Sequence, residues 1–242
     1  MCLYKYRSVT KNSLEILINR KIFLPNPSQF NDPFDGQLHP QNFMSELEEL
    51  GYKNDDSQIS RLEQYVSDRI NTYGIYSLSN KCDDILMWSH YSDAHKGFCL
   101  GFKRDLENYF DDYDWQIRKE SVRYESTHPF MNVYRDLVSN SRFNSNEKFL
   151  DYMDLGIALL EAAITIKHSS WEYEAEERII SEVKGQHSFE PEALVCIVLG
   201  MNISKEDENT IRSLLNLNPW QHVKIYRAQR SKAALSLEII PA

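Results

Sequence analysis

The densest group of chemically capable side chains lies between Trp171 and Arg178. These eight residues hold four glutamates, an arginine and two large aromatic residues, and an apolar Ile-Ile pair follows them. In an extended strand alternate side chains share one face, which groups four charged residues of this stretch: Glu172, Glu174, Glu176 and Arg178. Neighbouring like charges destabilise a strand, so the row indicates a function. Carboxylates beside aromatic rings suit a site that stabilises positive charge.

Two structural interpretations of the same stretch compete with this functional one. The row fits the solvated, acidic edge strand of a sheet, where charges discourage aggregation. It also fits a helical turn in which Glu174 pairs with Arg178, four residues further on. The local pattern leaves all three interpretations open, so the other polar groups of the chain must be considered.

A second candidate group is the turn sequence Asn31-Asp32-Pro33-Phe34. Asparagine and aspartate side chains accept hydrogen bonds from nearby backbone groups, and proline fixes its own φ. The motif is therefore a turn in any case. Asn31 and Asp32 are also candidates to bind a ligand.

A third group spans a strand, a helix and a second strand. Ser77 and Ser79 share one face of the predicted strand 74–79, and Asp83 or Asp84 caps a predicted helix over 85–96 that Gly97 ends. This helix carries Trp88, His90 and Tyr91, which are candidates to contact a ligand, although Trp88 also suits a core. His90 and His95 are five residues apart, which does not fit the i,i+4 zinc pair, so we expect no metal site there.

Composition excludes several classes of protein. The 242 residues are 42% hydrophobic and 26% charged, which is typical of a globular protein, and the net charge of −9 argues against broad electrostatic binding of nucleic acid. No apolar run is long enough to span a membrane, and the N-terminus lacks the pattern of a signal peptide. The four cysteines are widely spaced, so we expect no zinc ribbon or disulfide framework and a cytoplasmic location.

The elements that must position these groups follow from hydrophobic periodicity. We expect one α+β domain over residues 1–242, with mixed or antiparallel core sheets, flanking helices and a helical insertion at 41–72. The core sheet is predicted to contain the strands 3–7, 75–79, 98–102, 177–183 and 195–199. Further strands are expected at 21–24, 223–227 and 235–240. Helices are expected at 13–20, from Ser145 through an apolar stripe of Phe149, Met153, Ile157, Leu160 and Ile164, and from Ser204 to about 216.

Several landmarks in this order resemble a bacterial family of domains of unknown function that is similar to the AbiGi-type abortive-infection proteins. The landmarks are Leu3-Tyr4-Lys5-Tyr6-Arg7, Asn31-Asp32-Pro33-Phe34, Met87-Trp88-Ser89-His90-Tyr91 with His95-x-Gly97, and Lys167-x-x-x-Trp171-x-Tyr173-Glu174-x-Glu176-x-Arg178. This resemblance implies a role in phage defence or as a toxin.

A looser resemblance concerns chemistry. The order of Arg7, the Ser-x-Ser of Ser77 and Ser79, and the Glu-x-Glu of Glu174 and Glu176 resembles that of ADP-ribosyltransferases. The resemblance implies that the arginine grips the phosphates and ribose of NAD and that the serine braces the site. It implies that Glu176 stabilises the oxocarbenium-like transition state while Glu174 takes the proton of the acceptor. Trp88 or Tyr91 would stack on nicotinamide.

Three functions therefore compete. The first is an ADP-ribosyltransferase or NAD glycohydrolase that uses NAD as substrate and an unidentified macromolecular acceptor. The second is a non-catalytic module of a defence system that binds a nucleotide or a partner. The third and weakest is a metal-dependent nuclease that uses Asp32, His90 and the glutamates. The first requires Arg7, Ser77 and Glu176 to meet at one cleft.

Overall fold

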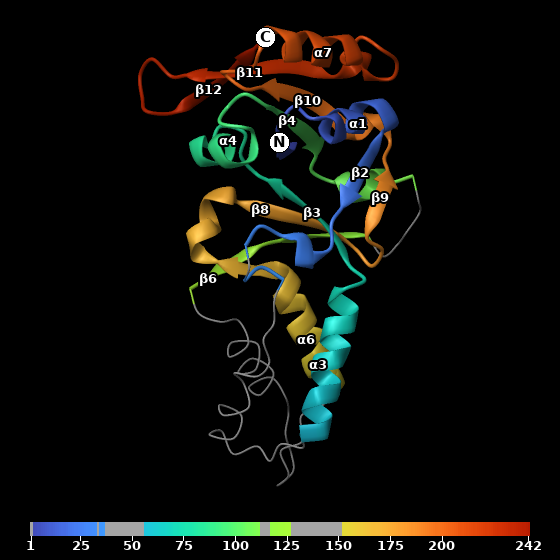
Figure 1. Cartoon of the computed structure of the whole chain (residues 1–242). Coiled ribbons are helices and arrows are strands. Elements are labelled where there is room, and N and C mark those ends of the chain that lie inside the picture. Colours follow the sequence, from blue (N-terminus) through green and yellow to red (C-terminus); the bar gives the residue numbers. More distant parts are fainter. Residues whose placement is uncertain (1, 33, 37–55, 112–116, 127–151) are drawn as a thin grey trace.

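A computed structural model of the chain describes residues 2–32, 34–36, 56–111, 117–126 and 152–242 (Figure 1). Its strands are β1 (Cys2–Arg7), β2 (Lys21–Leu24), β3 (Gly74–Ser79), β4 (Phe98–Lys103), β5 (Arg118–Ser121), β6 (Arg123–Glu125), β7 (Ile166–His168), β8 (Glu176–Ser181), β9 (Gly185–Ser188), β10 (Leu194–Leu199), β11 (Lys224–Arg230) and β12 (Leu237–Pro241). Its α-helices are α1 (Lys11–Asn19), α3 (Asp56–Ile70), α4 (Ile85–Tyr91), α6 (Tyr152–Thr165) and α7 (Lys205–Leu215).

Eight strands form one mixed, mostly antiparallel sheet in the order β12-β11-β10-β4-β1-β3-β8-β5. Within it β10 and β11 run parallel, and the other neighbours run antiparallel. All five strands predicted for the core lie in this sheet, so the predicted α+β class is confirmed. The strand expected at 21–24 is present as well, but it pairs with β9 in a separate two-stranded sheet.

The large sheet opens in its middle, between β1 and β3. Six residue pairs join β1 to β4, whereas the β1–β3 register consists of the single pair Tyr4–Ser79. Beyond this pair the Lys5 ammonium spans the two strands and donates to the Ser77 carbonyl oxygen at 2.7 Å. The rest of β1 and β3 therefore present facing edges that backbone pairing does not close.

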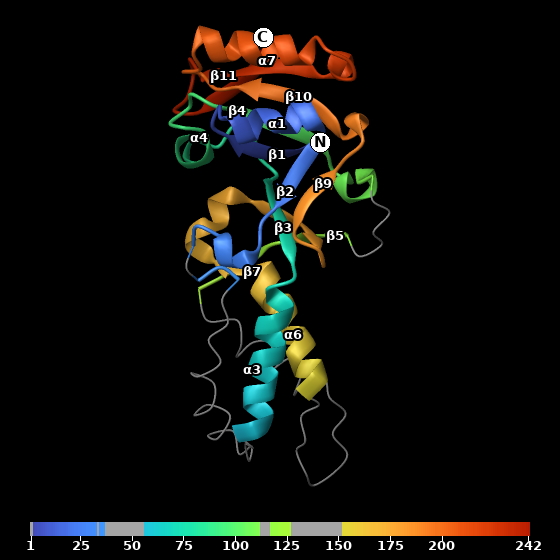
Figure 2. The same ribbon diagram turned by 45° about the vertical axis from the view of Figure 1, so that its right-hand side comes forward.

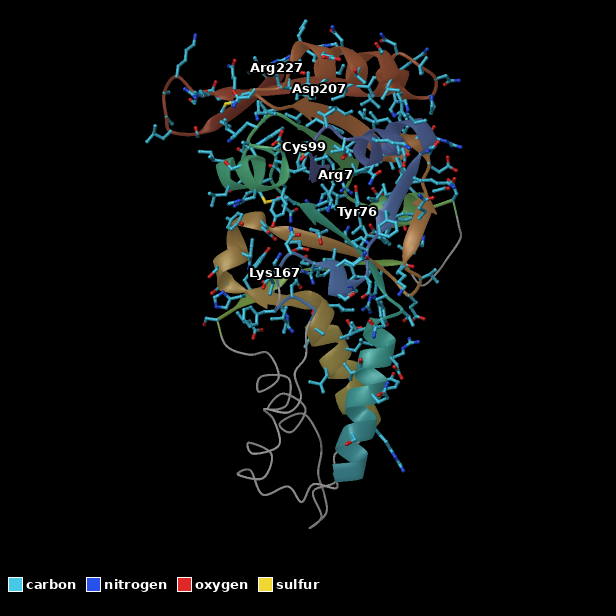
Figure 3. All side chains as sticks on the ribbon, in the orientation of Figure 1. Arg7, Tyr76, Cys99, Lys167, Asp207 and Arg227 are labelled. Carbon is cyan, nitrogen blue, oxygen red and sulfur yellow. The ribbon has the colours of Figure 1, made fainter. Side chains whose placement is uncertain are left out.

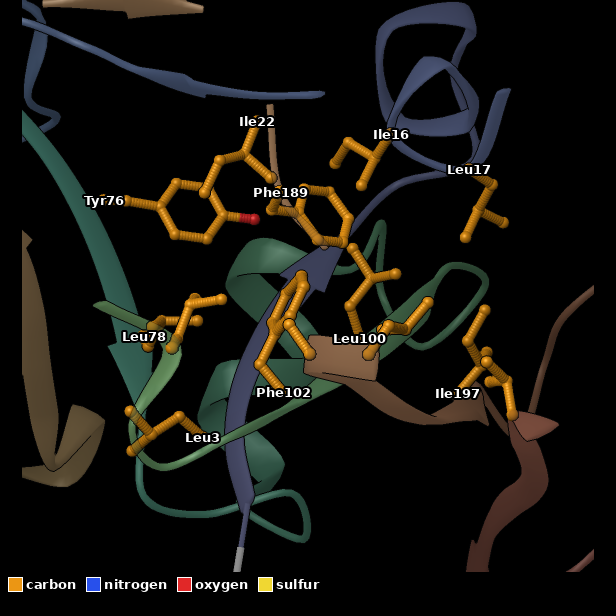
Figure 4. Packing of buried hydrophobic residues seen from close by; sticks show 14 of the residues in the cluster. Leu3, Ile16, Leu17, Ile22, Tyr76, Leu78, Leu100, Phe102, Phe189 and Ile197 are labelled. Atoms are coloured by element: carbon orange, nitrogen blue, oxygen red, sulfur yellow. The ribbon is translucent and has the colours of Figure 1, made fainter. Parts of the chain in front are cut away.

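The two faces of the sheet bury separate hydrophobic clusters. On one face, side chains of β4 and β10 pack against α1 and Phe189, and Figure 4 shows Phe102 pointing toward Phe189, on the side of the sheet where Ile16 and Leu17 of α1 lie. Thr10 begins α1 by accepting from the Ser13 backbone N–H, as a threonine cap does. On the other face α4 covers the sheet with Met87 and Trp88. Burial of each such large side chain contributes about 1.5–3 kcal/mol.

A pair of helices projects from the lower end of the sheet. α3 and α6 lie side by side there in both views (Figures 1 and 2), and Val66 and Ile70 of α3 are buried. α3 is the described part of the predicted insertion 41–72; its residues before 56 lie outside the described residues, as do Ser145 and Phe149 of the predicted long helix. On α6, Leu160 and Ile164 are buried but Ile157 is 47% exposed, so the predicted stripe is wrong at that position.

The predicted helix over 85–96 is too long. Asp84 caps it as expected, but α4 ends at Tyr91, and Asp93, Ala94 and His95 all have positive φ, which no right-handed helix contains. The turn brings the chain back against β1 at Gly97, where a Cβ would lie 2.0 Å from the Arg7 carbonyl oxygen. A side chain at position 97 would collide with β1, which explains the glycine.

Candidate active site at the split in the sheet

A cavity of about 460 Å³ lies where the sheet opens. One wall is β1, from Tyr4 to Arg7. The opposite wall is built from β3, β7 and β8, together with the turn at residues 31–35 and the segment from Trp171 to Glu174 that precedes β8. Figure 3 shows Arg7 of β1 above Lys167 of β7, with Tyr76 of β3 between them in height. The cavity is lined by nine of the ten predicted site residues: Arg7, Asn31, Asp32, Ser77, Ser79, His90, Tyr91, Glu174 and Glu176.

The acidic stretch reaches the cavity by a different route from the predicted strand. Residues Ser169–Glu174 form a 3-10 helix, η4, whose first turn His168 caps by accepting from the Ser170 N–H. Ala175 then adopts a left-handed conformation with φ 45°, and β8 begins only at Glu176. The predicted common strand face is therefore wrong. Glu172 is exposed, and the turn at Ala175 still directs Glu174 and Glu176 to the same cavity.

Both structural interpretations of this stretch are also wrong. β8 lies between β3 and β5, so it is not the edge of the sheet. Glu174 does not pair with Arg178; its Oε2 accepts from the Lys167 ammonium at 2.6 Å. The carboxylates of Glu174 and Glu176 are buried and paired with cations, whereas a solvated acidic edge strand would expose them to water.

Lys167 of β7 is the common partner of three carboxylates. Its Nζ lies 2.6 Å from Glu174 Oε2, 3.1 Å from Glu176 Oε2 and 3.5 Å from Asp35 Oδ2. The same ammonium sits 5.0 Å from the centre of the Trp171 ring, in cation–π geometry. Although burial opposes the charge, the three carboxylates raise the pKa of Lys167 above its usual value, so the side chain stays cationic.

Arg178 is the second cation of this cluster and is fully buried. Its Nε donates to Glu176 Oε1 at 2.8 Å, its Nη2 to Asp35 Oδ2 at 2.6 Å, and its Nη1 to the Ile164 carbonyl at 3.0 Å. Burial alone would raise the pKa of Glu176, but Arg178 and Lys167 outweigh it and lower that pKa well below the usual range. Glu176 is therefore ionised and held in one orientation.

Glu174 sits in a different environment although it is only two residues away. Its Oε1 accepts from the Tyr91 hydroxyl at 2.5 Å, which connects η4 to the end of α4. Burial raises the pKa of Glu174 in spite of Lys167, which lowers it. The two glutamates thus have pKa values shifted in opposite directions, the arrangement that suits one carboxylate to electrostatic stabilisation and the other to proton transfer.

The β1 wall carries the opposite charge. Lys5 and Arg7 both line the cavity, and both contact the face of Tyr76, with the Lys5 Nζ 4.7 Å and the Arg7 guanidinium carbon 5.9 Å from the ring centre. Burial and the nearby Arg7 lower the pKa of Lys5 to about 7. The Nε of Arg7 has no hydrogen-bond partner among the described residues. This wall can receive an anion.

The predicted serines have different positions. Ser79 Oγ donates to the Glu174 carbonyl oxygen at 2.6 Å, so it holds η4 against β3. Ser77 lies opposite Arg178 in the β3–β8 ladder, and its hydroxyl helps to lower the pKa of Glu176. Ser77 therefore stabilises the carboxylate of Glu176, and Ser79 holds the backbone of Glu174.

Trp88 does not line the cavity, which corrects its prediction as a stacking residue. Its side chain is fully buried, its Nε1 donates to the Cys82 carbonyl at 2.8 Å, and its ring packs edge-to-face on Tyr6 at 5.1 Å. An indole in this position supports the wall from behind. The aromatic groups that do line the cavity are His90, Tyr91, Trp171, Phe30, Tyr4 and Tyr6.

Lys5, Asp35 and Lys167 belong to the site but were not predicted as site residues. Lys5 and Lys167 lie within the sequence landmarks that carry the family resemblance, and this position could have marked them as site residues. Asp35 follows the Asn-Asp-Pro-Phe turn directly. No local pattern links it to Arg178, which is 143 residues away in sequence.

The described residues contain no group of three or more histidine, cysteine or acidic side chains placed to hold a metal ion. Of the acidic groups at the cavity, Glu174, Glu176 and Asp35 are paired with Lys167 or Arg178. These cations occupy oxygens of the two glutamates that a metal would need, so the geometry does not favour the nuclease interpretation.

Residues 87–179 match a protein family described as Protein of unknown function (DUF2971), in agreement with the predicted resemblance to a domain of unknown function. The matched segment contains Tyr91, Lys167, Glu174 and Glu176, whereas the cationic wall at Lys5 and Arg7 precedes it. No curated protein and no solved structure matches the chain. Among the described residues, none of the helices is long and apolar enough to cross a membrane.

Proposed function

We propose that the protein cleaves the nicotinamide–ribose bond of NAD and transfers the ADP-ribosyl group to an acceptor or to water. The observation that carries this proposal is the opposite charge of the two cavity walls. Lys5 and Arg7 face a cluster of three carboxylates and two cations, whose net charge is one negative when all five groups are ionised. NAD has the matching asymmetry, with an anionic pyrophosphate and a cationic nicotinamide end.

The cationic wall is suited to the pyrophosphate. Lys5 and Arg7 offer donors from one strand edge, and the N-terminus of α1 opens onto the same cavity, where Thr10 and Ser13 line it. Helix N-termini favour anions because their first backbone N–H groups are unpaired. The volume of about 460 Å³ falls in the range of small-molecule sites.

The carboxylate wall is suited to the bond that breaks. As the C1′–N1 bond lengthens, its electron pair leaves with nicotinamide and positive charge develops at C1′ of the ribose. Glu176 is ionised and fixed by Arg178, so it can stabilise this charge without reorganising. The lone pair of the acceptor then forms the new bond to C1′.

Glu174 is suited to take the proton that the acceptor loses. Its raised pKa makes it a better base than Glu176, and its hydrogen bond to Tyr91 fixes its orientation at the cavity. His90, Tyr91 and Trp171 supply flat surfaces on which the nicotinamide ring could stack.

The test is incubation of the purified full-length protein with NAD labelled in the nicotinamide ring, followed by measurement of released nicotinamide. We expect release that Arg7→Gln reduces and that Arg61→Gln, on the exposed surface of α3, does not. A second label in the adenine would remain in solution as ADP-ribose if water is the acceptor. It would migrate with a macromolecule if the reaction is a transfer.

The alternative is a module that binds a nucleotide without turnover. It would be supported if NAD bound in a manner that depends on Arg7 but no nicotinamide appeared. If nicotinamide is released, we propose that the activity serves phage defence or acts as a toxin by depleting NAD in the cell. Expression in bacteria should then lower cellular NAD, and Glu176→Gln should abolish this effect.

A further inference from the structure

Two buried carboxylates at the cavity each have an oxygen that no described group satisfies. Asp32 and Asp35 are 7% and 4% exposed, both line the cavity, and Asp32 Oδ2 and Asp35 Oδ1 have no hydrogen-bond partner among the described residues. A buried, unpaired acceptor costs free energy, so native proteins rarely keep one without a purpose. A ligand that donates hydrogen bonds would remove this cost.

The turn that carries the two carboxylates is firmly built. The Asp35 N–H donates to the Asp32 carbonyl at 3.1 Å, and the Phe34 N–H donates to Asp32 Oδ1 at 2.9 Å. Gly36 follows with φ 71°, and a Cβ there would lie 2.6 Å from the Pro27 side chain. Asp35 Oδ2 is held by Arg178. The two unpartnered oxygens therefore belong to one constrained turn that lines the cavity.

The surroundings select the kind of donor. Lys167 and Arg178 already contact Asp35 Oδ2, so a further cation at Asp35 would lie beside two like charges, and a phosphate would be repelled by the carboxylates. A carboxamide would bring its own carbonyl oxygen toward the two acceptors. Two neighbouring hydroxyl groups carry no net charge, and each can donate a hydrogen bond to one of the two free oxygens.

We infer that Asp32 and Asp35 form an acceptor pair for the ribose cis-diol of a nucleotide. The inference rests on the proposed function, because NAD supplies the ribose. Asp35 also holds Arg178, so Asp32 is the residue through which the inference can be tested with the least effect on the fold. In Asp32→Asn the amide oxygen can still accept from the Phe34 N–H, while the free acceptor becomes a donor.

The experiment is calorimetric titration of the full chain with a NAD analogue in which a methylene group replaces the ring oxygen of the nicotinamide ribose. This analogue keeps every hydroxyl but resists cleavage. Two further analogues lack the 2′-hydroxyl of one ribose or the other. For the wild type we expect one of these two to bind about 10- to 100-fold more weakly than the complete analogue.

The Asp32→Asn variant should bind the complete analogue more weakly than the wild type does, by a similar factor. Its affinity for the sensitive deoxy analogue should be little lower than its affinity for the complete analogue. Such non-additivity indicates that residue and hydroxyl interact. Asp68→Asn, on the exposed surface of α3, is the matched control and should behave as the wild type. The deoxy analogue that shows the coupling identifies the ribose.

Two results would overturn the inference while leaving the proposed function intact. One is unchanged affinity in Asp32→Asn, as expected if water satisfies the free oxygen; the other is simple addition of the two losses for both analogues. If Asp32→Asn and one deoxy analogue show the coupling but the wild type releases no nicotinamide from NAD, the acceptor pair stands and the enzymatic proposal fails. If the wild type binds none of the analogues, both fail.

Discussion

Arg178 and Asp35 are joined by a 2.6 Å contact between Nη2 and Oδ2, although 143 residues separate them in the sequence. Both side chains are buried. The pair ties β8 to the turn that follows the first strands of the chain, so it brings the carboxylate wall and the Asp32–Asp35 turn to the same cavity. The contact therefore organises the candidate site as well as the fold.

The two partners should differ in their importance for stability. Among the described ion pairs, Arg178→Gln leaves three carboxylates with Lys167 as their one remaining cation, whereas Asp35→Asn leaves two carboxylates with two cations. Loss of one partner of a buried ion pair typically costs about 3–5 kcal/mol, and we expect this for Arg178→Gln. For Asp35→Asn we expect about 1–2 kcal/mol, because burial already raises the pKa of Asp35 and opposes its charge.

Urea unfolding of both variants at pH 7, followed by circular dichroism, measures these differences. Asp68→Asn serves as the control for removal of an exposed carboxylate and should change the free energy of unfolding by less than about 0.5 kcal/mol. An Asp35→Asn loss equal to or larger than that of Arg178→Gln would contradict the charge argument.

The fold was largely predictable because its strands carry their signal locally. Leu194–Leu199 is a continuous apolar run and becomes a central strand, and Thr10 and Ser204 begin helices as their types suggest. The acidic stretch was not predictable in detail. An alanine at φ 45° separates η4 from β8, and alanine has no intrinsic preference for that conformation.

The candidate site was predictable in part for the same reason. The aromatic and polar residues that exceed packing needs do line one cavity, as the positions of Arg7, Tyr91 and Glu176 illustrate. The partner of each charge was not predictable, because Lys167 meets Asp35 only through the tertiary fold. Trp88 was misplaced because a buried indole and a stacking indole look alike in sequence.

Binding of NAD should weaken as pH rises through neutrality. Burial and Arg7 lower the pKa of Lys5 to about 7, while Glu176 and Glu174 act in the other direction. Below pH 7 the ammonium is charged and attracts the pyrophosphate; above it the free protein loses this charge. We expect the affinity to fall about tenfold between pH 6.5 and 8.5, because above pH 7 the Lys5 amine must take up a proton when the anion binds.

Calorimetric titration across this range, with the wild type and Lys5→Met, checks the expectation. The variant should bind more weakly at pH 6.5 and show little dependence on pH. His90→Gln is a necessary comparison because His90 also lines the cavity. A pH dependence that survives in Lys5→Met but disappears in His90→Gln would assign the effect to the histidine.

Trp88→Phe separates support of the cavity from contact with the ligand. The change removes the indole N–H that the Cys82 carbonyl accepts and leaves part of a fully buried volume empty. We expect the free energy of unfolding to fall by about 1–3 kcal/mol. Affinity for NAD below the melting transition should stay within about twofold of the wild type. Loss of affinity by a folded Trp88→Phe protein would restore the indole as a ligand contact.

The essential carboxylate should be Glu176. Glu176→Gln keeps the shape of the side chain and an oxygen that can accept from Arg178 Nε, but it removes the charge proposed to stabilise the ribosyl cation. We expect nicotinamide release to fall by about 10²–10³, the usual effect of losing one such electrostatic contact. The melting temperature should fall. The protein should nevertheless remain folded, because Arg178 and Lys167 keep Asp35 and Glu174 as partners.

Glu172→Gln is the matched control, since Glu172 is exposed on η4 and does not line the cavity. It should leave both the rate and the melting temperature close to those of the wild type. Rates should be compared as kcat and kcat/KM, since a loss confined to KM would mean that Glu176 binds NAD without favouring the transition state. Full activity in a folded Glu176→Gln protein would remove the transferase proposal, and the cavity would then be assigned to nucleotide binding without turnover.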